Sequence, residues 1–209
     1  MCPRTGRRTC VTSRLSAILA FIISALPGIA LAEWKPVEQE RTYPVSGSSG
    51  AELYAAIGQR GPKVGGLPLG AIAHTSFKLT WTRKYEPRDG GCVIAVNRPK
   101  LIITYVLPKL TGKPPQSVRQ EWETFISGVR DHEKVHGRMI VDMVKEIETI
   151  SVGFSVPNDP DCKAIRQELT RRLAEISQSQ RQKSRDFDKA EMSEGGNIHQ
   201  LILRLVNGS

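Results

Sequence analysis

The feature that most constrains the fold is a series of apolar residues from Trp122 to Ile150 that recur at alternating three- and four-residue steps. This spacing places them along one side of an α-helix, so the segment predicts a long amphipathic helix whose apolar side faces a core. Two histidines occupy the same side. The full stripe is Trp122, Phe125, Val129, His132, His136, Met139, Met143, Ile147 and Ile150. A fold that contains this helix must bury one continuous stripe and also satisfy two inward-facing imidazoles.

The two histidines belong to the sequence His132-Glu133-Lys134-Val135-His136, the His-Glu-x-x-His pattern that is typical of zinc hydrolases. Residues four apart lie on one helix face, so both imidazoles can bind a single Zn²⁺. Bound zinc lowers the pKa of its water, and a neighbouring carboxylate takes the proton as the water attacks a carbonyl. We therefore expect a zinc site at His132 and His136, with Glu133 as the catalytic carboxylate. The alternative is an ordinary helix with two satisfied core histidines.

The first 32 residues have the composition of an export signal. They contain four arginines, no acidic residue, an apolar stretch and a small-x-small sequence at 30–32. This pattern predicts a signal peptide that is cleaved before Glu33 and leaves 33–209 as a single domain. The alternative is a retained membrane anchor, for which the apolar stretch is short and is broken by a Pro-Gly pair. We expect a periplasmic or secreted protein with no membrane span after leader removal.

The charge of the chain is mildly basic. The formal net charge of +9 falls to +5 when the four leader arginines are removed. The remaining lysines and arginines are scattered along the expected helices, and no basic run alternates with aromatic residues. We therefore expect no nucleic-acid partner.

Two cysteines, Cys92 and Cys162, lie beyond the leader. An even number of cysteines in an exported chain favours a disulfide, which would close a long loop. The alternative is that a cysteine serves as a zinc ligand.

The first half of the domain contains short extended segments and turns. Pro44 confines the first extended segment to a sheet edge. Ser49 and Glu52 match a capping box that opens a short helix. Short connections favour antiparallel pairing of the strands. The expected elements are strands at 42–45, 74–84, 92–97 and 101–107, a helix at 49–57 and a Gly/Pro-rich loop at 61–70.

The second half is predicted to be helical. Ser117 and Gln120 match a second capping box, which opens the long helix, and this helix ends near Ile150. Asp159-Pro160 opens another helix that ends at Gly195, and a last helix covers 198–205. The short connection makes the two long helices antiparallel neighbours. The predicted fold is α+β, with a small antiparallel sheet packed beside a long two-helix hairpin that carries the histidine motif.

The order of these features resembles the proteobacterial family of predicted secreted zinc-dependent proteases, a domain of unknown function. The resemblance covers roughly residues 42–195. It implies that His132 and His136 are metal ligands, that Glu133 is catalytic, and that Cys92 and Cys162 form a disulfide. The features that carry it are the Tyr43-x-Val45 strand, the Gly-Pro loop, Trp81, Cys92, Leu107-Pro108, Trp122 ten residues before the motif, and Cys162.

A catalytic zinc site needs a third protein ligand. The resemblance makes Asp188 the expected one, because Phe187-Asp188 matches an aromatic-Asp pair of the family. A His-Gly pair that follows in the family is replaced here by Ser193-Glu194-Gly195. The other candidates are Glu191, Glu194, His199 and, because an antiparallel helix would bring residues 175–180 level with the motif, Glu175.

We expect a zinc metallopeptidase-like hydrolase that acts on a peptide or protein substrate. One alternative is a non-catalytic, zinc-holding envelope binding protein, and another is an amidase that acts on cell-wall peptides. His74 is expected at a strand edge and not as a ligand. Tyr105 is expected in the core, with an oxyanion donor as its alternative role.

Overall fold

The computed structural model describes residues 34–66 and 68–208. The predicted signal peptide lies outside the described residues. The residues from Trp34 onward form one compact unit. Its elements are β1 (Val37–Val45), α1 (Gly50–Arg60), β2 (His74–Arg88), β3 (Gly91–Leu110), α2 (Gln116–Ser151), β4 (Ser155–Val156), α3 (Ala164–Met192) and α4 (Asn197–Asn207).

The strands form a mixed sheet with the order β1-β3-β2, in which β4 also pairs with β3. The β2–β3 pair is antiparallel, as predicted, and β4, a short strand that was not predicted, is also antiparallel to β3. The prediction was wrong for β1, which pairs in parallel with β3. Short connections favour antiparallel pairing only between consecutive strands, and β1 lies across β3 from β2 after a crossover through α1.

Strand β3 is longer than predicted because it continues through Pro99, where the sequence indicated a break between two strands. Pro99 pairs with Trp81 of β2, whereas β1 reaches β3 only from Ile102 onward. At Pro99 the strand therefore has a partner on one side only. A residue without an N–H is tolerated where one side of the strand is open.

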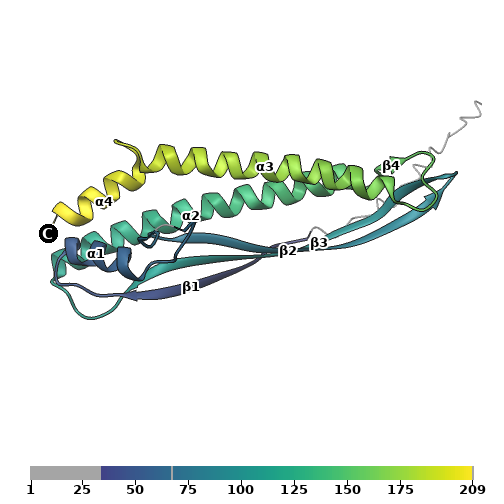
Figure 1. Cartoon of the computed structure of the whole chain (residues 1–209). Helices are drawn as coiled ribbons and strands as arrows, with labels where there is room; N and C mark the ends of the chain where they lie inside the picture. Colours follow the sequence, from purple (N-terminus) through teal and green to yellow (C-terminus); the bar gives the residue numbers. More distant parts are fainter. Residues whose placement is uncertain (1–33, 67, 209) are drawn as a thin grey trace, which may run out of the picture. The chain divides into compact units, whose positions relative to one another are not determined.

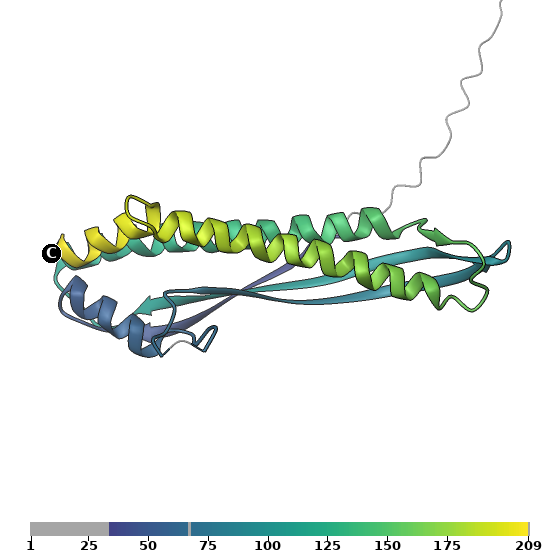
Figure 2. The same cartoon turned by 45° about the horizontal axis from the view of Figure 1, so that its top comes forward.

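The helices lie on one face of this sheet, and α2 runs along β3 with α3 beside it (Figures 1 and 2). Alternate residues of β3 point to this face and are buried, among them Leu101, Ile103 and Leu107. They pack against the apolar stripe of α2, which is buried at Trp122, Phe125 and other positions. The α+β architecture is thus confirmed, with a mixed sheet.

The two predicted capping boxes have different outcomes. Ser49 caps α1, because its side chain accepts a hydrogen bond from the Glu52 N–H. The prediction for Ser117 and Gln120 was wrong, since α2 begins after Pro115 without a side-chain capping bond. Gln116 and Ser117 are exposed, so water can satisfy the N–H groups that this helix start leaves open.

The connection between α2 and α3 is attached to the start of β3. Strand β4 pairs with Cys92 and Val93, and Cys92 forms the predicted disulfide with Cys162. Helix α3 begins at Ala164, later than predicted. The Asp159 carboxylate accepts hydrogen bonds from the N–H groups of Lys163, just before this helix, and of Ala164 and Ile165, its first two residues. It therefore satisfies donors that a helix start leaves open.

Within the described residues, none of the helices has a stretch that is both long and apolar enough to cross a membrane.

The capping role of Asp159 makes a prediction about acid stability. Burial alone would raise the pKa of Asp159, but its three backbone hydrogen bonds and the charge of Arg166 outweigh burial and hold the pKa below its usual 3.8. A carboxylate with a depressed pKa stabilises the fold above its unfolded-state pKa, and this contribution is lost as the pH falls through the folded-state value. Asp159→Asn should therefore be less stable than the wild type by a constant amount above pH 3.8, and the difference should shrink below it.

Urea unfolding of both proteins over a series of pH values measures this difference. Asp161→Asn is the control, because the exposed Asp161 carboxylate bonds only to the Lys163 side chain. A stability difference for Asp159→Asn that stays constant or grows at acid pH would contradict the capping role.

Candidate metal centre

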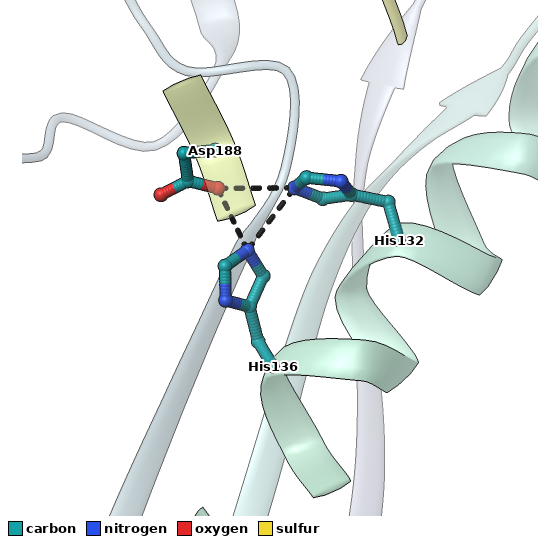
Figure 3. A group of neighbouring side chains, drawn as sticks. All are labelled: His132, His136 and Asp188. Atoms are coloured by element: carbon teal, nitrogen blue, oxygen red, sulfur yellow. Dashed lines mark hydrogen bonds and ion pairs between the residues drawn. The ribbon is translucent and has the colours of Figure 1, made fainter. Parts of the chain in front are cut away.

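The structure brings His132, His136 and Asp188 together between α2 and α3 (Figure 3). The Nε2 atoms of the two histidines are 3.0 Å apart. Oδ1 of Asp188 lies 3.2 Å from His132 Nε2 and 2.8 Å from His136 Nε2. Three atoms that can each donate a lone pair therefore converge on one small space.

The histidines reach this space because their positions on α2 belong to the buried stripe. His132 is 9 % exposed and His136 is 8 % exposed. Asp188 comes from α3, and its side chain is half-exposed at the rim. The shared burial of the two imidazoles is the arrangement that the motif predicts on an amphipathic helix, whereas Asp188 was expected from the family resemblance.

Glu175 is not at the site. It is exposed on α3 and pairs with Arg171. The prediction placed Glu175 level with the motif because it assumed a short turn between the helices. The connection 152–163 instead continues beyond the end of α2 and pairs with β3, so α3 starts further from the histidines. A residue deeper in α3, Asp188, is therefore the one that lies level with His136.

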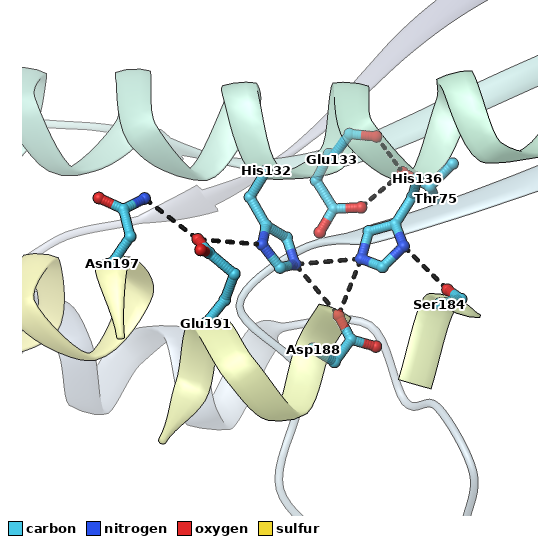
Figure 4. A network of polar contacts seen from close by, with 8 residues as sticks. All are labelled: Thr75, His132, Glu133, His136, Ser184, Asp188, Glu191 and Asn197. Carbon is cyan, nitrogen blue, oxygen red and sulfur yellow. Dashed lines mark hydrogen bonds and ion pairs between the residues drawn. The ribbon is translucent and has the colours of Figure 1, made fainter. Parts of the chain in front are cut away.

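The remaining third-ligand candidates lie outside the cluster of three. Glu191 has an oxygen 3.8 Å from His132 Nδ1, and it also accepts a hydrogen bond from Asn197 (Figure 4). His199 Nδ1 accepts a hydrogen bond from the N–H of Gly195. Glu194 is exposed in the turn after α3.

Side chains of α3 fix the orientation of both imidazoles. Ser184 Oγ lies 2.8 Å from His136 Nδ1. If His136 binds a metal through Nε2, its ring proton lies on Nδ1 and can be donated to this hydroxyl. The ring of Phe187 stacks on His132 with centroids 4.7 Å apart and meets His136 edge-on. Such supports are typical of imidazoles that bind metals.

Glu133 is buried beside the histidines, with 6 % of its surface exposed. One of its carboxylate oxygens accepts a hydrogen bond from the Thr75 hydroxyl, which projects from the start of β2 (Figure 4). The carboxylate is therefore held by β2, and among the described residues it forms no hydrogen bond with either histidine.

A cleft of about 480 Å³ adjoins these groups. The loop before β2 forms one wall, and α2 together with the end of α3 forms the other. The polar lining consists of the motif residues, Asp188, Ser184 and the start of β2. The apolar lining is Val64, Ala71, Ile72, Ala73, Val129, Met192 and Ile198.

The electrostatics of the cluster favour an ionised carboxylate. Burial alone would raise the pKa of Asp188, but hydrogen bonds from His132 and His136 outweigh burial and hold it well below its usual value. Burial alone would lower the pKa of His136, but the bond to Asp188 and the charges of Asp188 and Glu133 raise it above its usual value. Asp188 is thus available as an anionic ligand, and a proton on His136 would compete with a cation.

The two other residues that the sequence singled out, Tyr105 and His74, do not belong to the group of three ligand-type atoms. Tyr105 packs in the core against Gly137, on the side of α2 that faces β3. Its hydroxyl is buried without a hydrogen-bond partner among the described residues, and burial first of all raises its pKa to about 12. His74 lines the cleft at the start of β2. Since Thr75 points toward α2, strand alternation directs the His74 side chain to the opposite face.

Three supporting residues were not predicted from the sequence in these roles. Thr75 and Ser184 are single hydroxyl residues in a strand and in a polar helix, where no spacing pattern marks them. Phe187 was noted only as part of the aromatic-Asp pair, and its stacking on His132 is a structural finding.

The fold and the cluster define the class of protein: an α+β domain with a potential metal-binding group between two antiparallel helices. The chain belongs to the family described as bacterial protein of unknown function (DUF922), which it matches over residues 40–196. That range includes the histidine motif and Asp188. No curated protein and no solved structure matches the chain. The family assignment carries no activity with it.

The contact of Gly137 with Tyr105 predicts a steric constraint beside the motif. A Cβ at position 137 would lie 2.1 Å from the Tyr105 hydroxyl oxygen. Gly137→Ala should therefore destabilise the fold by about 1–3 kcal/mol through overpacking. In a Tyr105→Phe background the clashing oxygen is gone, so the same substitution should cost roughly 1 kcal/mol less.

Denaturant unfolding of the four proteins in this cycle gives both costs. Gly58→Ala is the matched control, because a Cβ there has its nearest contact at 4.0 Å. It should be neutral or stabilising, as expected for an alanine in an open helix position. An equal cost for Gly137→Ala in both backgrounds would show that Tyr105 does not limit this position.

Proposed function

We propose that this protein is a zinc-dependent hydrolase that cleaves peptide or other amide bonds. The observation that carries the proposal is the convergence of His132 Nε2, His136 Nε2 and Asp188 Oδ1 beside the buried carboxylate of Glu133. Two imidazoles and one carboxylate are a common ligand set of catalytic zinc, which keeps a fourth position open. The residues also fit the ion chemically. The two Nε2 atoms lie 3.0 Å apart, and only one of them can donate a proton to the other. A cation, by contrast, can bind the lone pairs of both.

Zinc bound by these three residues would supply a Lewis acid and would acidify a water molecule. The contribution of Glu133 is to accept a proton at its carboxylate and to return it to the leaving amine. Thr75 holds that carboxylate in one orientation by its hydrogen bond. Ser184 and Phe187 keep the imidazoles aligned, which limits the rearrangement that the ligands need on binding.

The cleft and the covalent structure support the assignment of substrate and location. A cleft of about 480 Å³ with a mainly apolar lining and a few convergent polar groups is suited to a segment of a peptide. The Cys92–Cys162 disulfide is consistent with a periplasmic or secreted protein, since such bonds persist in oxidising compartments. A peptide or protein substrate is therefore the proposed partner.

The role of Glu133 predicts that metal binding and turnover can be separated. Purified wild type should bind about one zinc per chain and hydrolyse members of a broad peptide library. Glu133→Gln keeps the shape of the side chain and removes the base. It should keep the zinc and lose at least 10²–10⁴-fold in rate. Zinc content and hydrolysis are measured on the same preparations.

Asp131→Asn is the matched control, because Asp131 is an exposed acid on the same turn of α2 and does not line the cleft. It should retain both zinc and activity. Equal hydrolysis by the wild type and Glu133→Gln would exclude Glu133 as the base. Zinc-loaded wild type that cleaves nothing in the library would instead favour a non-catalytic zinc-binding protein.

The hydrogen bond of Ser184 predicts an effect on affinity for the metal. Ser184→Ala removes the partner of His136 Nδ1 and frees the ring to rotate. Loss of such a support typically costs 10–100-fold in metal affinity. Competition with a zinc chelator measures the change. Ser179→Ala, an exposed serine on the same helix, should have no effect. An unchanged affinity in Ser184→Ala would mean that this hydroxyl does not orient the ligand.

A further inference from the structure

The face of the sheet that points away from the helices carries an excess of positive charge. Helices α2, α3 and α4 all lie on the other side (Figures 1 and 2). The uncovered face is identified by alternation from the buried residues of β3, and its residues are exposed or partly exposed. In its central part they are Lys78, Thr80, Thr82 and Lys84 on β2 and Val96, Arg98, Lys100 and Ile102 on β3.

The register brings three of these cations next to one another. Lys78 pairs with Ile102, and Thr80 pairs with Lys100, so Lys78 and Lys100 are diagonal neighbours at about 7–8 Å. Arg98 lies two residues before Lys100 on the same face, at about 6.6 Å along the strand. We call Lys78, Arg98 and Lys100 the cationic strip.

The strip is not neutralised by the chain itself. In the part of the chain that the structure describes, no carboxylate forms a salt bridge with Lys78, Arg98 or Lys100, although ion pairs are common on the helices. The nearest acid on this face is Glu86, and it pairs with Lys84. Like charges on neighbouring positions of a sheet are destabilising, so an isolated strip of this kind is better explained by an anionic partner than by folding.

We propose that the cationic strip binds the surface of an anionic phospholipid bilayer. The strip lies on an uncovered sheet face, and lipid phosphates are dense enough to meet each cation without a fixed register. Between Lys78 and Lys84 the outward side chains are hydroxyls and cations, without an aromatic ring. Stacking platforms, which single-stranded nucleic acids require, are therefore lacking on this stretch of β2. A second copy of the chain would present the same charge and be repelled.

The two faces of the sheet would then have separate roles. Thr75 points toward α2 and the cleft, whereas Lys78 points to the uncovered face. A bilayer at the strip would leave the cleft between α2 and the loop before β2 open to solvent. The inference does not depend on the proposed hydrolase function, because no residue of the strip lines the cleft.

Co-sedimentation of the purified protein with vesicles tests the proposal. The wild type should bind vesicles of equal parts phosphatidylglycerol and phosphatidylcholine, should not bind pure phosphatidylcholine, and should be released by salt. Each cation near such a surface contributes about fivefold to partitioning, so the triple variant K78E/R98E/K100E should bind at least 100-fold more weakly. The neutral variant K78Q/R98Q/K100Q is measured as well, because it tests the same three cations if charge reversal impairs folding. It should also bind more weakly than the wild type.

The control is R119E/K145E/R181E, which changes the net charge equally at exposed helix positions. It should bind far more tightly than the strip variant. Absence of binding by the wild type, or an equal loss in the control and strip variants, would overturn the proposal. Stronger binding to a single-stranded oligonucleotide than to the vesicles, at equal phosphate concentration, would also overturn it in favour of a nucleic-acid partner.

Discussion

The packing of α3 against α2 is the interaction on which the site depends. Neither helix alone brings three ligand-type atoms together, because the motif on α2 offers two imidazoles and the carboxylate comes from α3. The relative position of the helices is fixed at the far end, where β4 pairs with β3 and the Cys92–Cys162 bond joins the connection to the sheet. Ile165 and Leu169 of α3 are buried next to this bond. A covalent and hydrophobic anchor at one end therefore sets which residue of α3 meets the histidines at the other.

Burial of polar groups in this contact has a cost that the site must offset. Two imidazoles and a glutamate are withdrawn from water on a stripe that is otherwise apolar. Groups of this kind are retained when they are hydrogen-bonded or bind a metal. Ser184, Thr75 and Asp188 satisfy part of the requirement, whereas His132 Nδ1 has no hydrogen-bond partner in the described structure. The proposed zinc ion would complete the interactions of both Nε2 atoms and would give the ionised Asp188 a cation to bind.

The sequence was sufficient for the elements with strong periodicity. The stripe predicted α2 and the shared face of the two histidines, and alternation predicted β2. Asp188 was singled out by family resemblance, since a single acid in a polar helix has no distinguishing pattern. Glu175 was misplaced because the length of a connection does not reveal that it pairs with a sheet. The parallel pairing of β1 depends on a crossover, and Thr75 and Ser184 depend on tertiary contact, so local patterns could not predict them.

The central claim is that His132, His136 and Asp188 together bind one zinc ion. Anomalous diffraction at the zinc edge, from crystals grown with one equivalent of zinc, tests it most directly. The account predicts a single strong peak between α2 and α3, within bonding distance of His132 Nε2, His136 Nε2 and an Asp188 oxygen, at about 2.0–2.2 Å. A peak that lies elsewhere, or one that contacts the histidines while Asp188 turns to solvent, would contradict it.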